Sequence, residues 1–228
     1  MKRLKSDRAQ WRAERRQELL LPSYSLSEEI MSAITHGIGV GLAIAGLVVL
    51  LVFCRHDPLT VVTVSIFGAT MIMLYLVSTL YHALGVNQAK KVFQILDHCT
   101  IFLLIAGTYT PLSLLCFGGV TGWVMFGIVW GVAVLGIVLN AVDLYRFRKF
   151  SMICYIGLGW FVIFFFKPMV ERIDRTSILF LIVGGVIYTV GAILYGVGKK
   201  VKYIHSVWHF FVIGGTIFHY FVVFRVVT

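Results

Sequence analysis

The last apolar run of the chain, YIHSVWHFFVIGGTIFHYFVVFR at residues 203–225, is long enough to cross a membrane as a single helix. A helix rises 1.5 Å per residue, so about 20 apolar residues span the roughly 30 Å of bilayer hydrocarbon. His205 and His209 lie four residues apart near the start of the run, and therefore on one face of the helix. Such a pair predicts either two ligands of one metal ion or a polar seam between packed helices.

Six further apolar runs precede this one, at residues 32–54, 59–84, 95–117, 120–142, 150–167 and 176–197. The composition agrees with a lipid environment, since 59% of the 228 residues are hydrophobic and 13% are charged, about half the charged fraction of a soluble domain. Residues 1–29 are instead polar and rich in arginine. We therefore expect an all-α polytopic membrane protein, with a basic cytoplasmic tail at residues 1–29 and a bundle of seven transmembrane helices at residues 30–228.

Lysine and arginine are distributed unevenly between the two sides that this topology creates. Fifteen of the 20 lie in the tail or near residues 85–94, 143–149 and 198–202, and five lie on the other side. Because cytoplasmic segments carry the excess of positive charge, the N-terminus is expected in the cytoplasm and the C-terminus outside. The net charge of +10 could also indicate a nucleic-acid partner. Because the basic residues lie in short clusters between apolar runs, an anionic membrane surface is the favoured partner instead.

The few polar side chains inside the apolar runs gather at the cytoplasmic end of the predicted bundle. The segment STLYHAL places Ser78 and His82 one helical turn apart at the inner end of the second run. Asp97 begins the third run, and His205 and His209 begin the last. Residues distant in sequence thus share one depth in the membrane, where an ionisable group is expensive and is a candidate functional residue by default.

Three of these residues, His82, His205 and His209, have the character of a catalytic zinc site. Zinc enzymes commonly use three protein ligands and leave a fourth position for water, which the metal activates near neutral pH. Soluble metalloproteases carry a glutamate base between two helical histidines, whereas SVW separates His205 from His209. We therefore assign the general base to Asp97 and expect Ser78 to orient a ligand or hold a substrate oxygen. The competing interpretation is a packing seam of histidines; if a metal is bound, imidazole ligands favour zinc over iron or manganese.

The remaining histidines and acids of these segments receive lesser roles. His36 is a candidate for supporting the metal ligands, and His219 is expected at the membrane interface. His98 is expected to bond a loop carbonyl group or to face the interface. Glu28 and Glu29 are expected to cap the first helix. None of these five residues is assigned to the chemistry.

The segments EEIMSAITHGIG, STLYHAL, DHCTIFLLIAGTYTP and HSVWHFFVIGG together resemble the signature blocks of bacterial haemolysin III-like proteins, within the progestin and adiponectin receptor superfamily. The resemblance runs from about residue 24 to the end of the sequence. It implies a seven-helix bundle in the bacterial plasma membrane, with a cytoplasmic N-terminus. It also implies an intramembrane zinc ion held by histidines that match His82, His205 and His209. The family's serine falls on Ser78 and its aspartate on Asp97.

The similarity of this metal site to that of alkaline ceramidases implies a zinc-dependent hydrolase of a lipid amide or ester, acting in membrane-lipid homeostasis. Membrane lipids are then the expected partners, with the substrate entering from the bilayer, and the pattern favours no particular oligomeric state. Two other functions stay open, a pore-forming cytolytic haemolysin and a sensor of membrane state with a structural zinc. Against a pore, the runs between residues 120 and 197 contain almost no charged side chains that could line a channel.

Overall fold

The computed structural model describes residues 2–198 and 201–228, and all regular structure within these ranges is helical. The α-helices of this part of the chain are α1 (Lys2–Glu18), α2 (Leu26–Phe53), α3 (Pro58–Ala83), α4 (Gln88–Pro111), α5 (Gly119–Gly159), α6 (Phe166–Arg172), α7 (Arg175–Val197) and α8 (Ile204–Val227). A π-helical turn, η1 (Leu112–Phe117), follows α4, and a 3-10 segment, η2 (Phe161–Phe165), links α5 to α6. The all-α class predicted from the sequence is confirmed.

Six helical stretches in the described ranges are long and apolar enough to cross a membrane. One of them is the 54-residue stretch Gly119–Arg172, which contains α5, η2 and α6. The outer surface of the bundle exposes large apolar side chains, such as Leu42 on α2, Val138 on α5 and Ile193 on α7. Because so much exposed apolar surface is stable in hydrocarbon and not in water, the fold is that of a multi-pass membrane protein.

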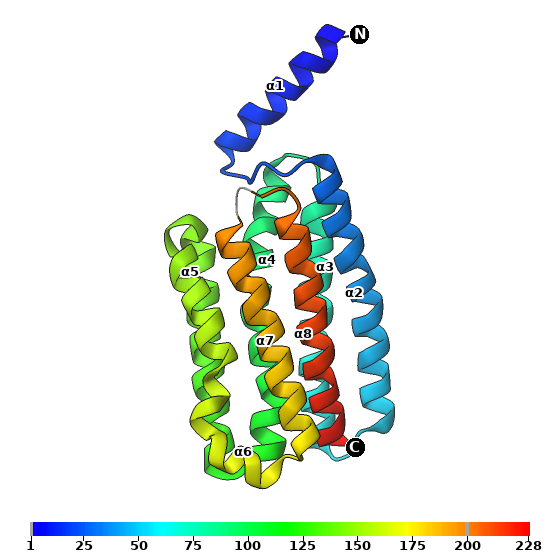
Figure 1. Ribbon diagram of the computed structural model, residues 1–228, viewed down its shortest axis with the longest axis vertical. Helices are drawn as coiled ribbons and strands as arrows, with labels where there is room; N and C mark the ends of the chain where they lie inside the picture. Colours follow the sequence, from blue (N-terminus) through cyan, green and yellow to red (C-terminus); the bar gives the residue numbers. More distant parts are fainter. Residues whose placement is uncertain (1, 199–200) are drawn as a thin grey trace.

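Helix α5 doubles back at Asp143, whose backbone angles of φ −157° and ψ 93° are not helical. The arms on either side lie together, because Ser151 Oγ donates to Asn140 Oδ1 at 2.6 Å and Asn140 Nδ2 donates to the hydroxyl of Tyr155 at 3.3 Å. The α5 ribbon accordingly runs toward one end of the bundle and returns (Figure 1). The fourth predicted apolar run therefore forms the first arm of α5, and the fifth, residues 150–167, covers the second arm together with η2 and the start of α6.

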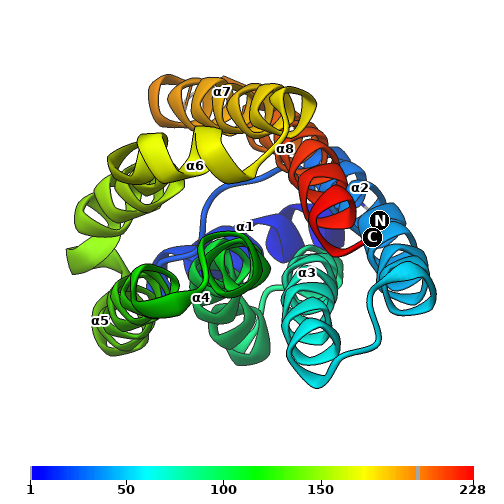
Figure 2. The ribbon, with the colours of Figure 1, turned by 90° about the horizontal axis from the view of Figure 1, so that it is seen from below.

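The helices pack into a bundle in which α2 contacts α3 and α8, α3 contacts α4, α4 contacts α5, and α7 contacts α8. Seen along the bundle axis, they are arranged around a common centre, and α8 lies beside α2 (Figure 2). One core cluster joins α4 to α5 around Phe102 and Met125, and another joins α2, α3 and α8 around Phe67 and Val223. In lipid, such contacts stabilise the bundle mainly through close packing, because surrounding acyl chains are as apolar as the side chains.

One end of the bundle gathers the helix termini that carry the predicted site. There α3 ends and α2, α4 and α8 begin, with α1 projecting beyond them (Figure 1). Ser25 and Glu28 close the N-terminus of α2 in a capping box, as expected for Glu28. Glu28 Oε1 also accepts a hydrogen bond at 2.8 Å from the backbone N–H of Tyr203, the residue that precedes α8. These bonds fix the starts of α2 and α8 side by side.

Candidate metal centre

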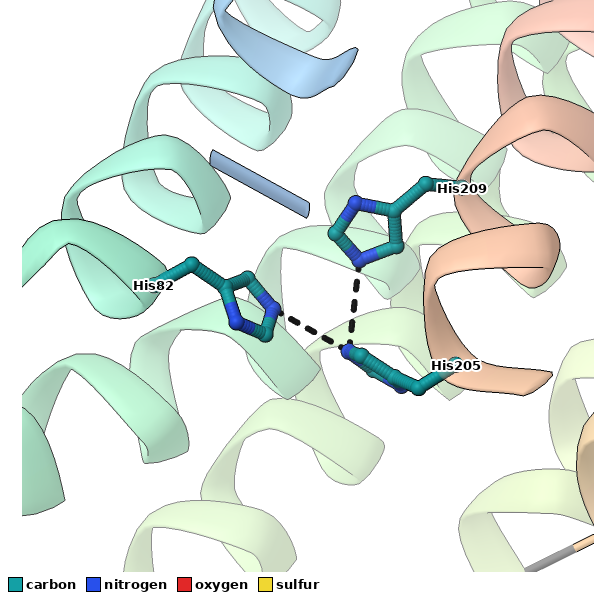
Figure 3. Close-up of side chains that lie close together, drawn as sticks. All are labelled: His82, His205 and His209. Carbon is teal, nitrogen blue, oxygen red and sulfur yellow. Dashed lines mark hydrogen bonds between the residues drawn. The ribbon is translucent and has the colours of Figure 1, made fainter. Parts of the chain in front are cut away.

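Three buried imidazole rings meet at this end of the bundle (Figure 3). His82 lies in the last turn of α3, and His205 and His209 lie in the first two turns of α8. His205 Nε2 is 3.1 Å from His82 Nε2 and 3.2 Å from His209 Nε2. One ligand atom of each ring lies within 4.8 Å of the others, so the three histidines could hold a metal ion. The structure thus brings together the histidines that the sequence analysis singled out.

The outer nitrogens of two of these rings face hydrogen-bond acceptors. His82 Nδ1 is 2.8 Å from Glu29 Oε2, and His209 Nδ1 is 3.2 Å from the carbonyl oxygen of Ser32. Because a carboxylate and a carbonyl group only accept, each Nδ1 carries the proton that it donates. In its neutral form, each ring therefore directs the lone pair of its Nε2 atom toward the centre of the cluster.

Nitrogen lone pairs that face one another repel, whereas a cation placed between them would bind them all. A proton on His205 Nε2 could bond only one of the two facing nitrogens, and would leave the other buried lone pair without a donor. With metal–nitrogen bonds of about 2.0–2.1 Å, tetrahedral zinc holds its ligand nitrogens about 3.3 Å apart. The two separations of 3.1 Å and 3.2 Å are close to that value. The donor set therefore fits a divalent metal ion.

Ser78 and Asp97 line the same cavity as the three histidines. Ser78 lies one turn before His82 on α3, is 1% exposed, and its Oγ has no hydrogen-bond partner among the described residues. Asp97 lies in the third turn of α4 and is half-buried. Buried polar groups are normally hydrogen-bonded, so the free hydroxyl of Ser78 is available to a molecule in the cavity.

His36 lies against one of the three histidines. Its ring stacks on that of His209, with the ring centroids 3.6 Å apart and the planes inclined by 14°. Both of its nitrogens are buried without a hydrogen-bond partner in the described part of the chain. The ring face of His36 thus contacts one of the three histidines, and its supporting role toward a metal ligand stays a prediction.

The other two histidines of the apolar runs differ from each other. His98 Nδ1 donates to Gln94 O at 2.9 Å, so it bonds a carbonyl group of its own helix and not the loop carbonyl that was expected. His219 Nε2 donates to Leu181 O at 3.3 Å, and the residue lines the cavity. The expectation of an interfacial His219 is therefore wrong. Its ring fits inside the bundle because the facing residue on α7 is Gly184, where a β-carbon would overlap the imidazole.

A cavity of about 1740 Å³ extends from the histidines into the bundle. Away from the metal-binding end, its wall includes many apolar and aromatic side chains, among them Leu104, Leu112, Val162 and Leu181. The second arm of α5 and the helix α7 both contribute to the wall. A cavity with one polar end and a long apolar remainder is suited to an amphiphilic molecule.

Two contributors to this end of the cavity were not predicted. Glu29 was expected to cap α2, but its carboxylate contacts His82 instead, because Glu28 already completes the capping box. The spacing of Ser25 and Glu28 was the available signal, since it leaves the second acid of the pair free. Tyr24, from the segment before α2, stacks on His205 and was not singled out at all.

Comparisons with known proteins agree with these observations. A family model described as "Haemolysin-III related" matches residues 24–220. The chain is 41% identical to "Hemolysin-3" of Bacillus cereus over 200 residues, which cover 87% of this chain and 91% of the relative. It is 40% identical to the "Hemolysin-3 homolog" of Bacillus subtilis over 202 residues, covering 88% and 94%. The human "Monocyte to macrophage differentiation factor" is 24% identical over 172 residues, covering 72% and 70%.

Proposed function

The chain belongs to the haemolysin III family of multi-pass bacterial membrane proteins, and we propose that it is a zinc-dependent hydrolase of a lipid amide or ester. The observation that carries this proposal is the convergence of three imidazole nitrogens at the polar end of a long, largely apolar cavity. A metal-binding end suits the scissile bond of a lipid, and the apolar remainder suits its chain.

In the proposed site, His82, His205 and His209 hold the zinc ion. When bound, zinc supplies Lewis-acid polarisation of a carbonyl group and activation of water near neutral pH. Three neutral imidazoles leave the charge of the ion undiminished, which favours both effects. Zinc fits this all-nitrogen donor set better than magnesium or calcium, which prefer oxygen ligands.

The chain itself provides two further groups for hydrolysis. Asp97 accepts the proton of the attacking water and then donates it to the leaving nitrogen or oxygen as the acyl bond breaks. Ser78, whose hydroxyl has no partner among the described residues, donates a hydrogen bond to the substrate carbonyl. Both residues line the cavity that the three histidines share, which supports these roles.

We also propose seven membrane crossings, with the N-terminus in the cytoplasm and the C-terminus outside. Helix α5 has 41 residues, about 62 Å of helix and twice the thickness of bilayer hydrocarbon. The first arm, up to Asp143, therefore has the length of one crossing, and the second reaches that length when it continues through η2 and α6 to Arg172. The excess of lysine and arginine in the tail and in the turns at that end supports the orientation. The metal site then lies near the cytoplasmic leaflet, and lipid enters the cavity from the bilayer.

Metal analysis of the detergent-purified protein tests the first part of the proposal. We expect about one zinc ion per chain by mass spectrometry, and almost none in a His205→Ala, His209→Ala double variant of equal monodispersity. His56→Ala is the matched control, because His56 is exposed in the turn before α3 and should leave the zinc content unchanged. A zinc-free parent, even after reconstitution with zinc, would make the histidines a packing seam.

Incubation with a bacterial lipid extract tests the second part. The parent should release a fatty acid or a deacylated lipid, and the double histidine variant should release none. Equal release by both proteins would contradict the assignment. Dye leakage from liposomes without product release would instead support the cytolytic function that the relatives' name suggests, and zinc binding without either would support a sensor.

A further inference from the structure

The carboxylate of Glu29 sits behind the metal-binding cluster and contacts the outer nitrogen of His82. We propose that Glu29 is a positioning residue, which fixes the proton of His82 on Nδ1 and so points its Nε2 toward His205 and His209. This inference rests on the proposed zinc site and adds to it a residue from the first turn of α2. Glu29 touches neither the metal position nor the substrate, and acts through His82.

The first argument is the geometry of the contact. Glu29 Oε2 is 2.8 Å from His82 Nδ1, and the two side chains are 6% and 0% exposed. At this distance and burial the bond competes with little water, so it holds the imidazole in one orientation and one tautomer. A carboxylate that accepts from a ligating histidine also raises the basicity of the nitrogen that faces the metal.

The second argument is that the other carboxylate oxygen is neutralised separately. Glu29 Oε1 is 3.1 Å from Lys90 Nζ and 3.3 Å from Arg16 Nη2. A buried carboxylate needs such partners, because desolvation of an unpaired charge is costly. Oε1 thus contacts the two basic side chains, and Oε2 is free to accept the hydrogen bond from His82.

Lys90 also ties Glu29 to the helix that carries His82. Its ammonium group is buried at the C-terminus of α3, where it donates to Tyr81 O at 2.8 Å and to Leu84 O at 3.1 Å. A cation at a helix C-terminus is favoured by the free carbonyl groups and the helix dipole. Lys90 therefore fixes Glu29 relative to the turn of α3 from which His82 projects.

The neighbouring acid, Glu28, provides a control within the same turn of helix. Its carboxylate accepts hydrogen bonds from Ser25 N and Tyr203 N, both at 2.8 Å, and it contacts none of the three histidines. Glu28 and Glu29 therefore have the same chemistry and neighbouring positions, but only Glu29 reaches a metal ligand. A comparison of variants at the two positions separates positioning of His82 from general support of α2.

The first test is the zinc affinity of the full-length protein in detergent, measured by competition with a chromogenic chelator. Removal of such an outer partner typically weakens metal binding about 10- to 100-fold, and we expect this for Glu29→Ala. Glu29→Gln keeps an acceptor oxygen for His82 Nδ1 and should lose less, while Glu28→Gln should stay within about threefold of the parent. If Glu29→Ala fails to fold, the nearly isosteric Glu29→Gln is compared with Glu28→Gln instead. Affinities equal to the parent for the Glu29 variants, or an equal loss for Glu28→Gln, would overturn the inference.

The second test needs no metal. Nitrogen-15 spectra of histidine-labelled, metal-free protein report which ring nitrogen carries the proton, and the His82 signals are assigned by their loss in His82→Gln. We expect the Nδ1-protonated form in the parent, a shift toward the Nε2-protonated form in Glu29→Ala, and a smaller shift in Glu29→Gln, which keeps an acceptor oxygen. An unchanged tautomer in both variants would overturn the inference. If the parent binds no zinc, the proposed function is wrong, but the inference about Glu29 is still tested, because the tautomer of His82 is measured without metal.

Discussion

The phenol ring of Tyr24 stacks on the imidazole ring of His205, with the ring centroids 4.8 Å apart and the planes inclined by 18°. Tyr24 belongs to the segment between α1 and α2, whose Leu19 and Leu21 pack on Tyr81. Burial raises the pKa of the Tyr24 hydroxyl well above its usual value, with a further contribution from Tyr195, so the ring stays neutral. This segment therefore covers the three histidines at the end of the cavity from the side of α1.

Replacement of Tyr24 by alanine is expected to open the metal site to water and chelators. Loss of the ring that covers His205 should accelerate zinc removal by at least about tenfold, because the ligand loses its outer packing partner. Tyr24→Phe retains the stacked ring and should release zinc at the parental rate. The measurement is the rate of zinc transfer to an excess of chelator after stopped-flow mixing. Equal rates for Tyr24→Ala and Tyr24→Phe would contradict the covering role.

Two glycines of α5 should respond oppositely to alanine. A β-carbon at Gly122 would overlap the backbone carbonyl oxygen of Ser113, which cannot move aside as a side chain could. Overpacking of this kind costs about 1–3 kcal/mol, so Gly122→Ala should lower the free energy of unfolding. Gly127 has no atom within 4 Å of such a β-carbon, and Gly127→Ala should be neutral or stabilise the helix by up to about 1 kcal/mol. Thermal unfolding in detergent measures both, and equal stability of the two variants would refute the packing argument.

The ion pair between Asp174 and Arg225 should make the free energy of unfolding depend on pH in the acid range. Asp174 caps α7, and its carboxylate Oδ1 is 3.0 Å from Arg225 Nη2. The Ser177 hydroxyl and the Arg225 guanidinium, which both donate to it, hold the pKa of Asp174 below its usual value. The folded state thus binds this proton more weakly than the unfolded state. The resulting stabilisation is present above the ordinary aspartate pKa of about 3.9 and is lost as the pH falls through the lower folded pKa.

Asp174→Ala should therefore reduce stability at pH 7 by about 1 kcal/mol, the usual effect of losing a helix cap. Asp174→Asn keeps a capping oxygen without the charge, so its stability at pH 7 should lie between that of Asp174→Ala and that of the parent. Unfolding curves should be measured at pH 7, 5 and 3. The difference in free energy of unfolding between the parent and Asp174→Ala should be smallest at pH 3. A gap that stays constant or widens in acid would show that the carboxylate charge contributes nothing.

The proposed topology predicts which turns face the outside of the cell. The end of α2 and the turn of α5 lie at opposite ends of the bundle (Figure 1). Arg55 follows α2, Arg146 lies just after the turn at Asp143, and both are exposed. In a variant without native cysteines, Arg55→Cys should react with an impermeant maleimide added to intact cells. Arg146→Cys should react only after the cells are permeabilised. The reverse pattern would invert the orientation, and labelling of both from outside would contradict seven crossings.

Much of the fold could be predicted because hydropathy is a strong signal in membrane proteins. Each apolar run must satisfy its backbone internally, which in lipid favours helices. The meeting of His82 with His205 and His209 was predictable from helical spacing and shared depth, since both follow from the order of the runs. The turn at Asp143 was predictable as a break between two runs, but its non-helical angles were not.

The parts that could not be predicted depend on contacts between segments. Helix α1 has few apolar residues, and its sequence allows both a short amphipathic helix and a solvated tail. The contact of Glu29 with His82 depends on the rotation of α2 against α3, which composition does not determine. Likewise, nothing in the sequence distinguishes Gly122, which lies against backbone, from Gly127, which faces open space.

The separation of the three histidines along the chain determines when the site can exist during synthesis. His82 precedes His205 by 123 residues, so a nascent chain exposes one member of the cluster long before the ribosome has made the other two. A chain interrupted between α3 and α8 contains a single histidine of the cluster and, beside it, a buried glutamate. Binding of the proposed ion would therefore be a late event of biogenesis, which follows insertion of α8 and marks a chain in which α3 and α8 have brought their histidines together.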